Sequence, residues 1–247
     1  MIPTFDVGIT SSLPDNAEFW VPTSEDLEDE GIGYFRDKWP ILDVSVDDAM
    51  GMLRLEVEIL DVVSSLVADP SEYEVLAHAV EAGSLNDVRD RFDSRPEWPR
   101  LQELVDDESS PLEGLDLGVS GLVHALVAAG LITAASCRGH HLRDAWSPYP
   151  VVYFATNRSR AEVLQPLVVE AGCGFDVDES RRELILVYSS SVENFVRLAH
   201  LILAGRDRFG VGSIVRDTNF DEGDHAAVVD DPNQLYLPGF GDPSLRP

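Results

Sequence analysis

The chain has 247 residues, a formal net charge of −27 and two cysteines. This length fits one elaborated domain or two small ones, and an apolar content of 44% excludes a wholly disordered protein. No apolar run approaches the roughly 18 residues of a membrane-spanning helix, and two cysteines cannot form a disulfide framework. We therefore expect a cytoplasmic protein with no membrane partner.

The N-terminal part of the chain divides into two predicted regions. Residues 1–44 combine prolines, aromatic residues and an acidic run, and predict an irregular acidic arm. Residues 45–110 predict a helical region, whose first helix begins at Ser45 and ends before Pro70. Shorter helices are expected at 71–82, 85–92 and 98–105. This region holds no reactive cluster, and we interpret it as a packing or partner-binding module.

From residue 115 the pattern alternates between helices and strands. The expected elements occupy residues 117–129, 131–136, 150–155, 157–171, 174–177, 183–188 and 191–204. Their order, α-β-β-α-β-β-α, predicts an α+β domain over 115–206, in which helices cover one face of a mainly antiparallel sheet. The last two strands should form a hairpin. Residues 207–247 predict a flexible acidic tail.

Several reactive side chains lie close together in the sequence at residues 136–141, at the end of the first predicted strand. Cys137 and His140 are candidates for catalysis, as a thiol nucleophile and its base. The candidate ligand-binding residues of this loop are Ser136, Arg138, Gly139, His141 and the nearby Arg143. Cys137 could instead join a histidine and Cys173 around a metal, but the spacing matches no zinc motif, so no metal site is predicted. A third alternative is a small buried thiol.

Two arginines occupy an unusual place in the predicted helix 157–171. Arg158 and Arg160 fall in its first turn, where the helix dipole disfavours cations. If they face the Cys137 loop, the helix N-terminus and the two guanidinium groups make an anion-binding site. The alternative is that they balance local acids such as Glu162.

A family resemblance covers roughly residues 115–205. The run Leu131–His140, which reads LITAASCRGH, resembles the T-x-S-C-S-G-R strand and loop of the tRNA wybutosine-synthesis methyltransferase family. The segments 151–156 and 173–175 stand where that family has a following strand and a C-G-F strand. The resemblance implies S-adenosylmethionine as cofactor and a nucleotide or RNA as ligand.

The predicted tail contains a second short motif. Gln234, Leu237 and Phe240 are spaced as in peptides that bind sliding clamps, which predicts a clamp-like protein partner. Alternatively, the apolar residues of the tail pack back onto the body of the protein.

The overall charge bears on the class of partner. Residues 115–206 hold nine acidic and eight basic residues, so nearly all of the excess acid lies outside them. Non-specific DNA binding is disfavoured, because a protein needs clustered positive charge to bind the DNA phosphates. We expect a non-enzymatic interaction and ligand-binding component of a nucleic-acid-related assembly, with an anion-binding site at 137–141. The alternatives are an RNA-modifying enzyme dependent on S-adenosylmethionine or a nucleotide, and an acidic mimic of nucleic acid.

Overall fold

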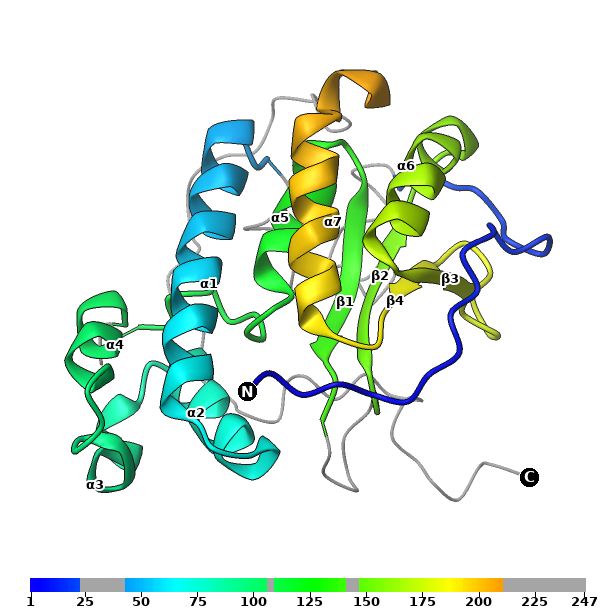
Figure 1. Cartoon of the computed structure of the whole chain (residues 1–247). Helices are drawn as coiled ribbons and strands as arrows, with labels where there is room; N and C mark the ends of the chain where they lie inside the picture. Colours follow the sequence, from blue (N-terminus) through cyan, green and yellow to red (C-terminus); the bar gives the residue numbers. More distant parts are fainter. Residues whose placement is uncertain (23–42, 106–108, 141–146, 211–247) are drawn as a thin grey trace.

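The computed structural model describes residues 1–22, 43–105, 109–140 and 147–210 and shows an α+β fold, as predicted (Figure 1). Four strands form one sheet: β1 (Ile132–Arg138), β2 (Pro150–Ala155), β3 (Gly174–Val177) and β4 (Ile185–Tyr188). The helices are α1 (Val46–Leu66), α2 (Pro70–Glu81), α3 (Arg89–Phe92), α4 (Trp98–Leu104), α5 (Ser120–Ala128), α6 (Arg158–Ala171) and α7 (Val192–Ala204). None of these helices is long and apolar enough to cross a membrane.

The sheet is antiparallel throughout, with strand order β1-β2-β4-β3. The predicted β3–β4 hairpin is confirmed. The first strand is longer than expected, because pairing with β2 continues to Cys137 opposite Val151 and to Arg138 opposite Pro150. These two residues therefore belong to a strand, and the prediction that they lie in a loop is wrong.

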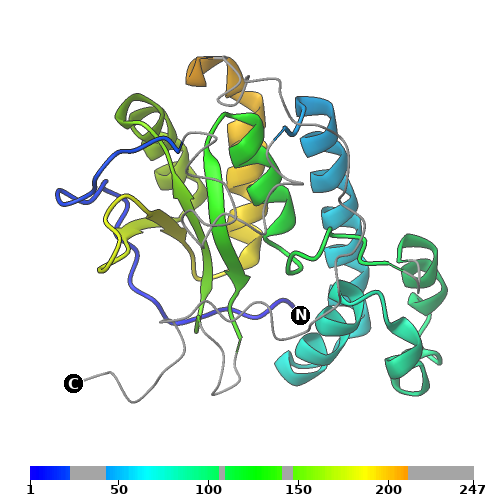
Figure 2. The same cartoon turned by 180° about the vertical axis from the view of Figure 1, so that it is seen from behind.

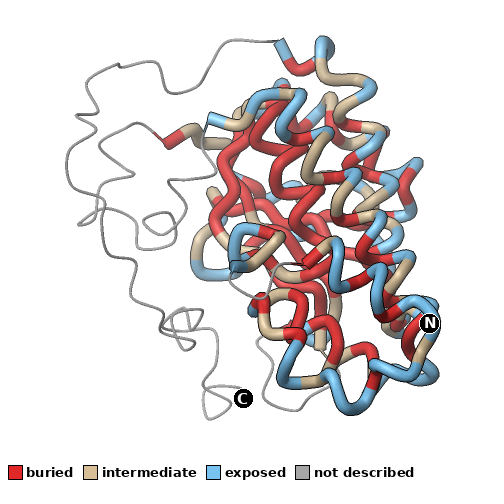
Figure 3. Tube along the Cα trace, turned by 90° about the vertical axis from the view of Figure 1, so that its left-hand side faces the viewer, coloured by how far each residue is buried: buried red, intermediate tan, exposed pale blue. Residues whose placement is uncertain are grey.

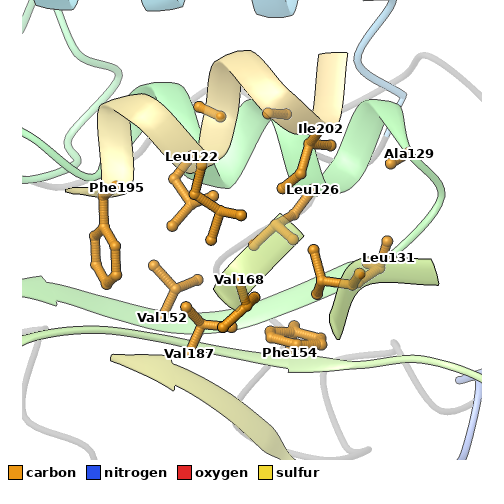
Figure 4. Packing of buried hydrophobic residues seen from close by; sticks show 14 of the residues in the cluster. Leu122, Leu126, Ala129, Leu131, Val152, Phe154, Val168, Val187, Phe195 and Ile202 are labelled. Atoms are coloured by element: carbon orange, nitrogen blue, oxygen red, sulfur yellow. The ribbon is translucent and has the colours of Figure 1, made fainter. Parts of the chain in front are cut away.

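Helices α5, α6 and α7 pack over one face of the sheet, and Figure 4 shows the core between them. Strand residues alternate between the two faces. Val152, Phe154 and Val187 point into the helical core, whereas Val151 and Leu186 form a smaller cluster with Cys137 on the opposite face. In Figure 2 helices α5, α6 and α7 lie behind the sheet, whereas α1 to α4 lie to its side. Among the described residues, helices therefore pack on one face of the sheet, as the element order predicts.

Helix α1 links the helical region to the sheet domain. Its residue Leu53 belongs to the core beneath α5 and α7, whereas Ile59 and Val63 pack in a second core with α2 and α4. Figure 1 shows α1 beside α5 and α7, and Figure 3 shows that buried positions run through both parts. Helix α1, the longest helix of the predicted helical region, thus contributes residues to both hydrophobic cores.

Residues 1–22 follow the edge of the sheet without forming a helix or a strand. The amide of Phe5 donates to the Ser190 carbonyl at 2.8 Å, and the amide of Phe175 in β3 donates to the Thr10 carbonyl at 2.7 Å. Residues 1–22 of the expected arm thus contain no helix or strand, and residues 23–42 lie outside the described residues.

The first residues of the predicted tail, 207–210, lie within the described part of the chain. Residues 206–209 form a short 3₁₀ helix, and Phe209 is buried. The Phe209 side chain packs in the core, so residues 207–209 are not flexible as the sequence predicted. The clamp-like motif of Gln234, Leu237 and Phe240 lies outside the described residues.

A buried carboxylate fixes the start of α5. Glu56, which projects from α1 and is fully buried, accepts the amides of Gly118 and Ser120 at Oε1 and the amide of Gly121 at Oε2, each at 2.9 Å. Those amides lack partners within the helix, so the carboxylate acts as their cap. Burial raises the pKa of Glu56 to about 7, although the three backbone hydrogen bonds oppose this rise.

The Glu56 interaction predicts a pH-dependent stability. A carboxyl pKa near 7 in the folded chain and 4.5 in the unfolded chain means that stability from this group is complete below pH 4.5 and is lost as the pH rises through 7. Relative to Glu56→Gln, the wild-type free energy of unfolding should fall by about 3 kcal/mol over this range. Chemical denaturation at several pH values measures the difference, and a difference that stays constant contradicts the prediction.

Candidate functional site

Three potential metal ligands from separate parts of the chain meet at the end of β1. Cys137 is the next-to-last residue of this strand, His140 follows two residues after the strand, and Asp116 precedes α5. One donor atom from each lies within 4.8 Å of the other two. The Asp116 Oδ2 atom is 3.7 Å from His140 Nε2, so these two donors already face each other. We call this group the Asp–Cys–His site.

The turn after β1 depends on Gly139. This residue has a φ of +77°, and a Cβ atom there would lie 2.6 Å from the backbone of Tyr149. Only glycine fits both constraints without strain. The turn directs the amide of Gly139 to the Cys137 sulfur at 3.4 Å and carries His140 back beside Asp116. The conformation of the glycine thus brings the thiol and the imidazole to the same place.

Arg138 binds two carboxylates from α2. Its Nε donates to Glu81 Oε1 at 2.7 Å, and its Nη1 donates to Glu74 Oε2 at 2.8 Å. The guanidinium group also lies 5.8 Å from the centre of the Tyr73 ring. Because Arg138 is only 2% exposed, these carboxylates offset the cost of burying its charge. This arginine is therefore paired with carboxylates of the protein itself.

Glu74 connects the arginine to the Asp–Cys–His site. Its Oε2 atom lies 3.2 Å from His140 Nδ1, in addition to the bond from Arg138. The second oxygen, Oε1, is buried and has no hydrogen-bond partner among the described residues. Glu81 has a different second contact, because its Oε1 accepts the amide of Leu117 at 2.8 Å.

The pKa values at the site show how strongly it favours positive charge. Burial lowers the pKa of His140, but hydrogen bonds with Asp116, Cys137 and Glu74 raise it to about 11. Burial raises the pKa of Glu74, but the interactions with His140 and Arg138 outweigh this and lower it to about 2. The pKa of the Cys137 thiol is raised by burial and by the charge of Asp116. The surroundings therefore stabilise the protonated, positively charged form of His140.

The predicted catalytic pair, Cys137 and His140, does come together in the structure. Of the predicted ligand-binding residues, Arg138 is bound to carboxylates, Gly139 shapes the turn, and Ser136 is half-buried on β1. His141 and Arg143 lie outside the described residues.

The prediction that Arg158 and Arg160 face the Cys137 loop is wrong. Arg160 donates to the backbone carbonyls of Gly130, Phe209 and Gly210, and Arg158 lies 4.3 Å over the ring of Phe19. Helix α6 starts just after Ala155, which pairs with Ile132 at the opposite end of β1 from Arg138. The seven residues of β1 separate its two ends by roughly 20 Å. These arginines therefore form no anion site with the loop.

Cys173 does not join Cys137 at the site. Its thiol instead donates to the Asn194 carbonyl, at a distance of 3.7 Å. The sequence analysis missed two residues of the site, Asp116 and the His140 partner Glu74. It also missed Glu81, which pairs with Arg138 and does not contact His140. A usable signal exists for each. Asp116 stands between two leucines, and the two glutamates are seven residues apart, which places them on one face of a helix.

Comparisons of the chain with family models, with curated proteins and with solved structures give no match.

The burial of Arg138 predicts a large loss of stability in Arg138→Met, because Glu74 and Glu81 would keep buried charges without their partner. Breaking such a network costs about 3 to 5 kcal/mol. Denaturant unfolding measures the change. The control is Arg100→Met, which removes exposed ion pairs with Glu58 and Glu103 and should lower stability far less. Equal losses in the two variants would contradict the proposed importance of burial.

Proposed function

We propose that this protein is metal-dependent and binds one divalent transition-metal cation of the zinc class through Asp116, Cys137 and His140. The observation that carries the proposal is the convergence of a carboxylate oxygen, a thiol sulfur and an imidazole nitrogen within 4.8 Å. A site of this kind can serve a structural role, or it can activate a bound water for hydrolysis.

The chemistry of the three donors favours zinc over harder cations. Thiolate and imidazole are preferred ligands of Zn²⁺ and similar metals, whereas Ca²⁺ and Mg²⁺ take oxygen ligands. Zinc ligands at about 2.0 to 2.3 Å from the metal lie roughly 3.5 Å apart. The 3.7 Å between Asp116 Oδ2 and His140 Nε2 is close to that separation, and the Cys137 sulfur lies within 4.8 Å of a donor atom of each of these residues.

The charges around the donors support a cation and not an anion. Asp116, Glu74 and Glu81 supply three carboxyl groups, and Arg138 is the fixed cation among them. A metal ion bound at His140 Nε2 would take the place of the proton on that nitrogen and keep the same carboxylates paired. This arrangement argues against the anion-binding role expected for residues 137–141.

The wider setting of the protein stays a prediction from the sequence. It includes a role in a nucleic-acid-related assembly with a protein partner, the alternative of an RNA-modifying enzyme that uses S-adenosylmethionine, and the alternative of a nucleic-acid mimic. A cytoplasmic location is likewise a prediction. The proposed metal site is compatible with each of these settings.

The proposal predicts that the purified full chain binds one Zn²⁺ with an affinity that depends on Cys137 and His140. Equilibrium dialysis followed by elemental analysis measures the stoichiometry. Cys137→Ser and His140→Ala should each weaken binding by about tenfold or more, because each removes one ligand. Cys173→Ser is the matched control, since this second buried thiol lies outside the site and its loss should leave binding unchanged.

Two results would overturn the metal proposal. One is zinc binding by Cys137→Ser that is as tight as in the wild type. The other is a chain that binds no metal and in which iodoacetamide modifies Cys137 rapidly. The second result would instead favour thiol chemistry, with His140 as base and Glu74 as the carboxylate that orients it.

A further inference from the structure

We infer that Glu74 is the outer-sphere positioning residue of the Asp–Cys–His site, through which helix α2 sets the orientation of the His140 ring. This inference rests on the proposed function, because it assigns the group that orients one of the proposed metal ligands. Glu74 does not itself belong to the ligand set.

The two nitrogens of His140 face different partners. Nε2 lies toward Asp116 at 3.7 Å, whereas Nδ1 lies 3.2 Å from Glu74 Oε2. When Nδ1 donates its proton to a carboxylate, the imidazole is held in the tautomer that leaves Nε2 free to bind a metal. Carboxylates in this position also make the imidazole a stronger ligand. Glu74 has the contact that such a role requires.

Arg138 holds the Glu74 carboxylate in place. The same Oε2 atom that faces His140 accepts a hydrogen bond from Arg138 Nη1 at 2.8 Å. Since Arg138 is itself buried and bound to Glu81, the carboxylate has little freedom to turn away. The orientation of the metal-binding imidazole is therefore fixed by a chain of charged contacts that begins on α2.

Glu81 provides a matched comparison within the same helix. Both glutamates accept a hydrogen bond from Arg138, both stand on α2, and their side chains are equally exposed at 11%. Only Glu74 contacts His140. If substituting a glutamate weakened metal binding merely by disturbing Arg138 or α2, substitution of either Glu74 or Glu81 should weaken it. If the loss came from the orientation of the imidazole, only substitution of Glu74 should weaken it.

The test compares Glu74→Gln with Glu81→Gln in the full chain. Zinc affinity is measured by competition with a chromophoric chelator, and the melting temperature of the metal-free protein is measured in parallel. We expect Glu74→Gln to weaken zinc binding by about 10- to 100-fold, the effect typical of losing an outer-sphere carboxylate. Glu81→Gln should bind zinc within about threefold of the wild type even where its melting temperature falls.

Cobalt substitution supplies a readout that separates this inference from the proposed function. In wild type and Glu74→Gln alike, Co²⁺ should give the thiolate-to-metal absorption band of Cys137, because the ligands are unchanged. Equal weakening in the two glutamine variants, or none in either, overturns the role of Glu74. Failure of the wild type itself to bind Co²⁺ or Zn²⁺ overturns the proposed function.

Discussion

The burial of the Arg138 guanidinium group is the constraint on which the rest of the site depends. A cation at this depth needs carboxylates, and they come from α2, more than fifty residues earlier in the chain. Helix α2 must therefore dock at the end of β1. Once docked, Glu74 also reaches His140, and Glu81 also accepts the amide of Leu117. One electrostatic network thus joins the helical region, the start of α5 and the reactive end of the sheet.

Elements with local signals could be predicted from the sequence. Strand β2 over 150–155 and strand β3 over 174–177 occupy the expected residues, and α6 ends before Gly172, which has a φ of +76°. The Asn157 side chain accepts the amide of Arg160 and caps the start of the same helix. Alternation of apolar residues, helix caps and left-handed glycines act within a few residues, so they are readable without knowledge of the fold.

The site itself depends on contacts between distant segments, and most of it could not be predicted. The sequence places Cys137 and His140 together, but it cannot show that Arg138 turns to α2 or that Arg160 binds backbone carbonyls at the other end of β1. Nor does it show that Asp116 completes the group. The assignment of the arginines to an anion site failed for this reason: their partners are set by strand register and helix docking, which have no local signature.

The N-terminal segment has a consequence for how the sheet meets other molecules. Strand β3 is the last strand of the sheet, and an unpaired outer strand is a template for pairing with another chain. Residues 1–22 cover this strand, with the Phe175 amide bound to Thr10 and the Ser11 hydroxyl bound to the Cys173 carbonyl. Thr10 and Ser11 thus occupy two backbone hydrogen-bonding groups at this edge, and groups of this kind are those through which the strand of a second molecule pairs with a sheet.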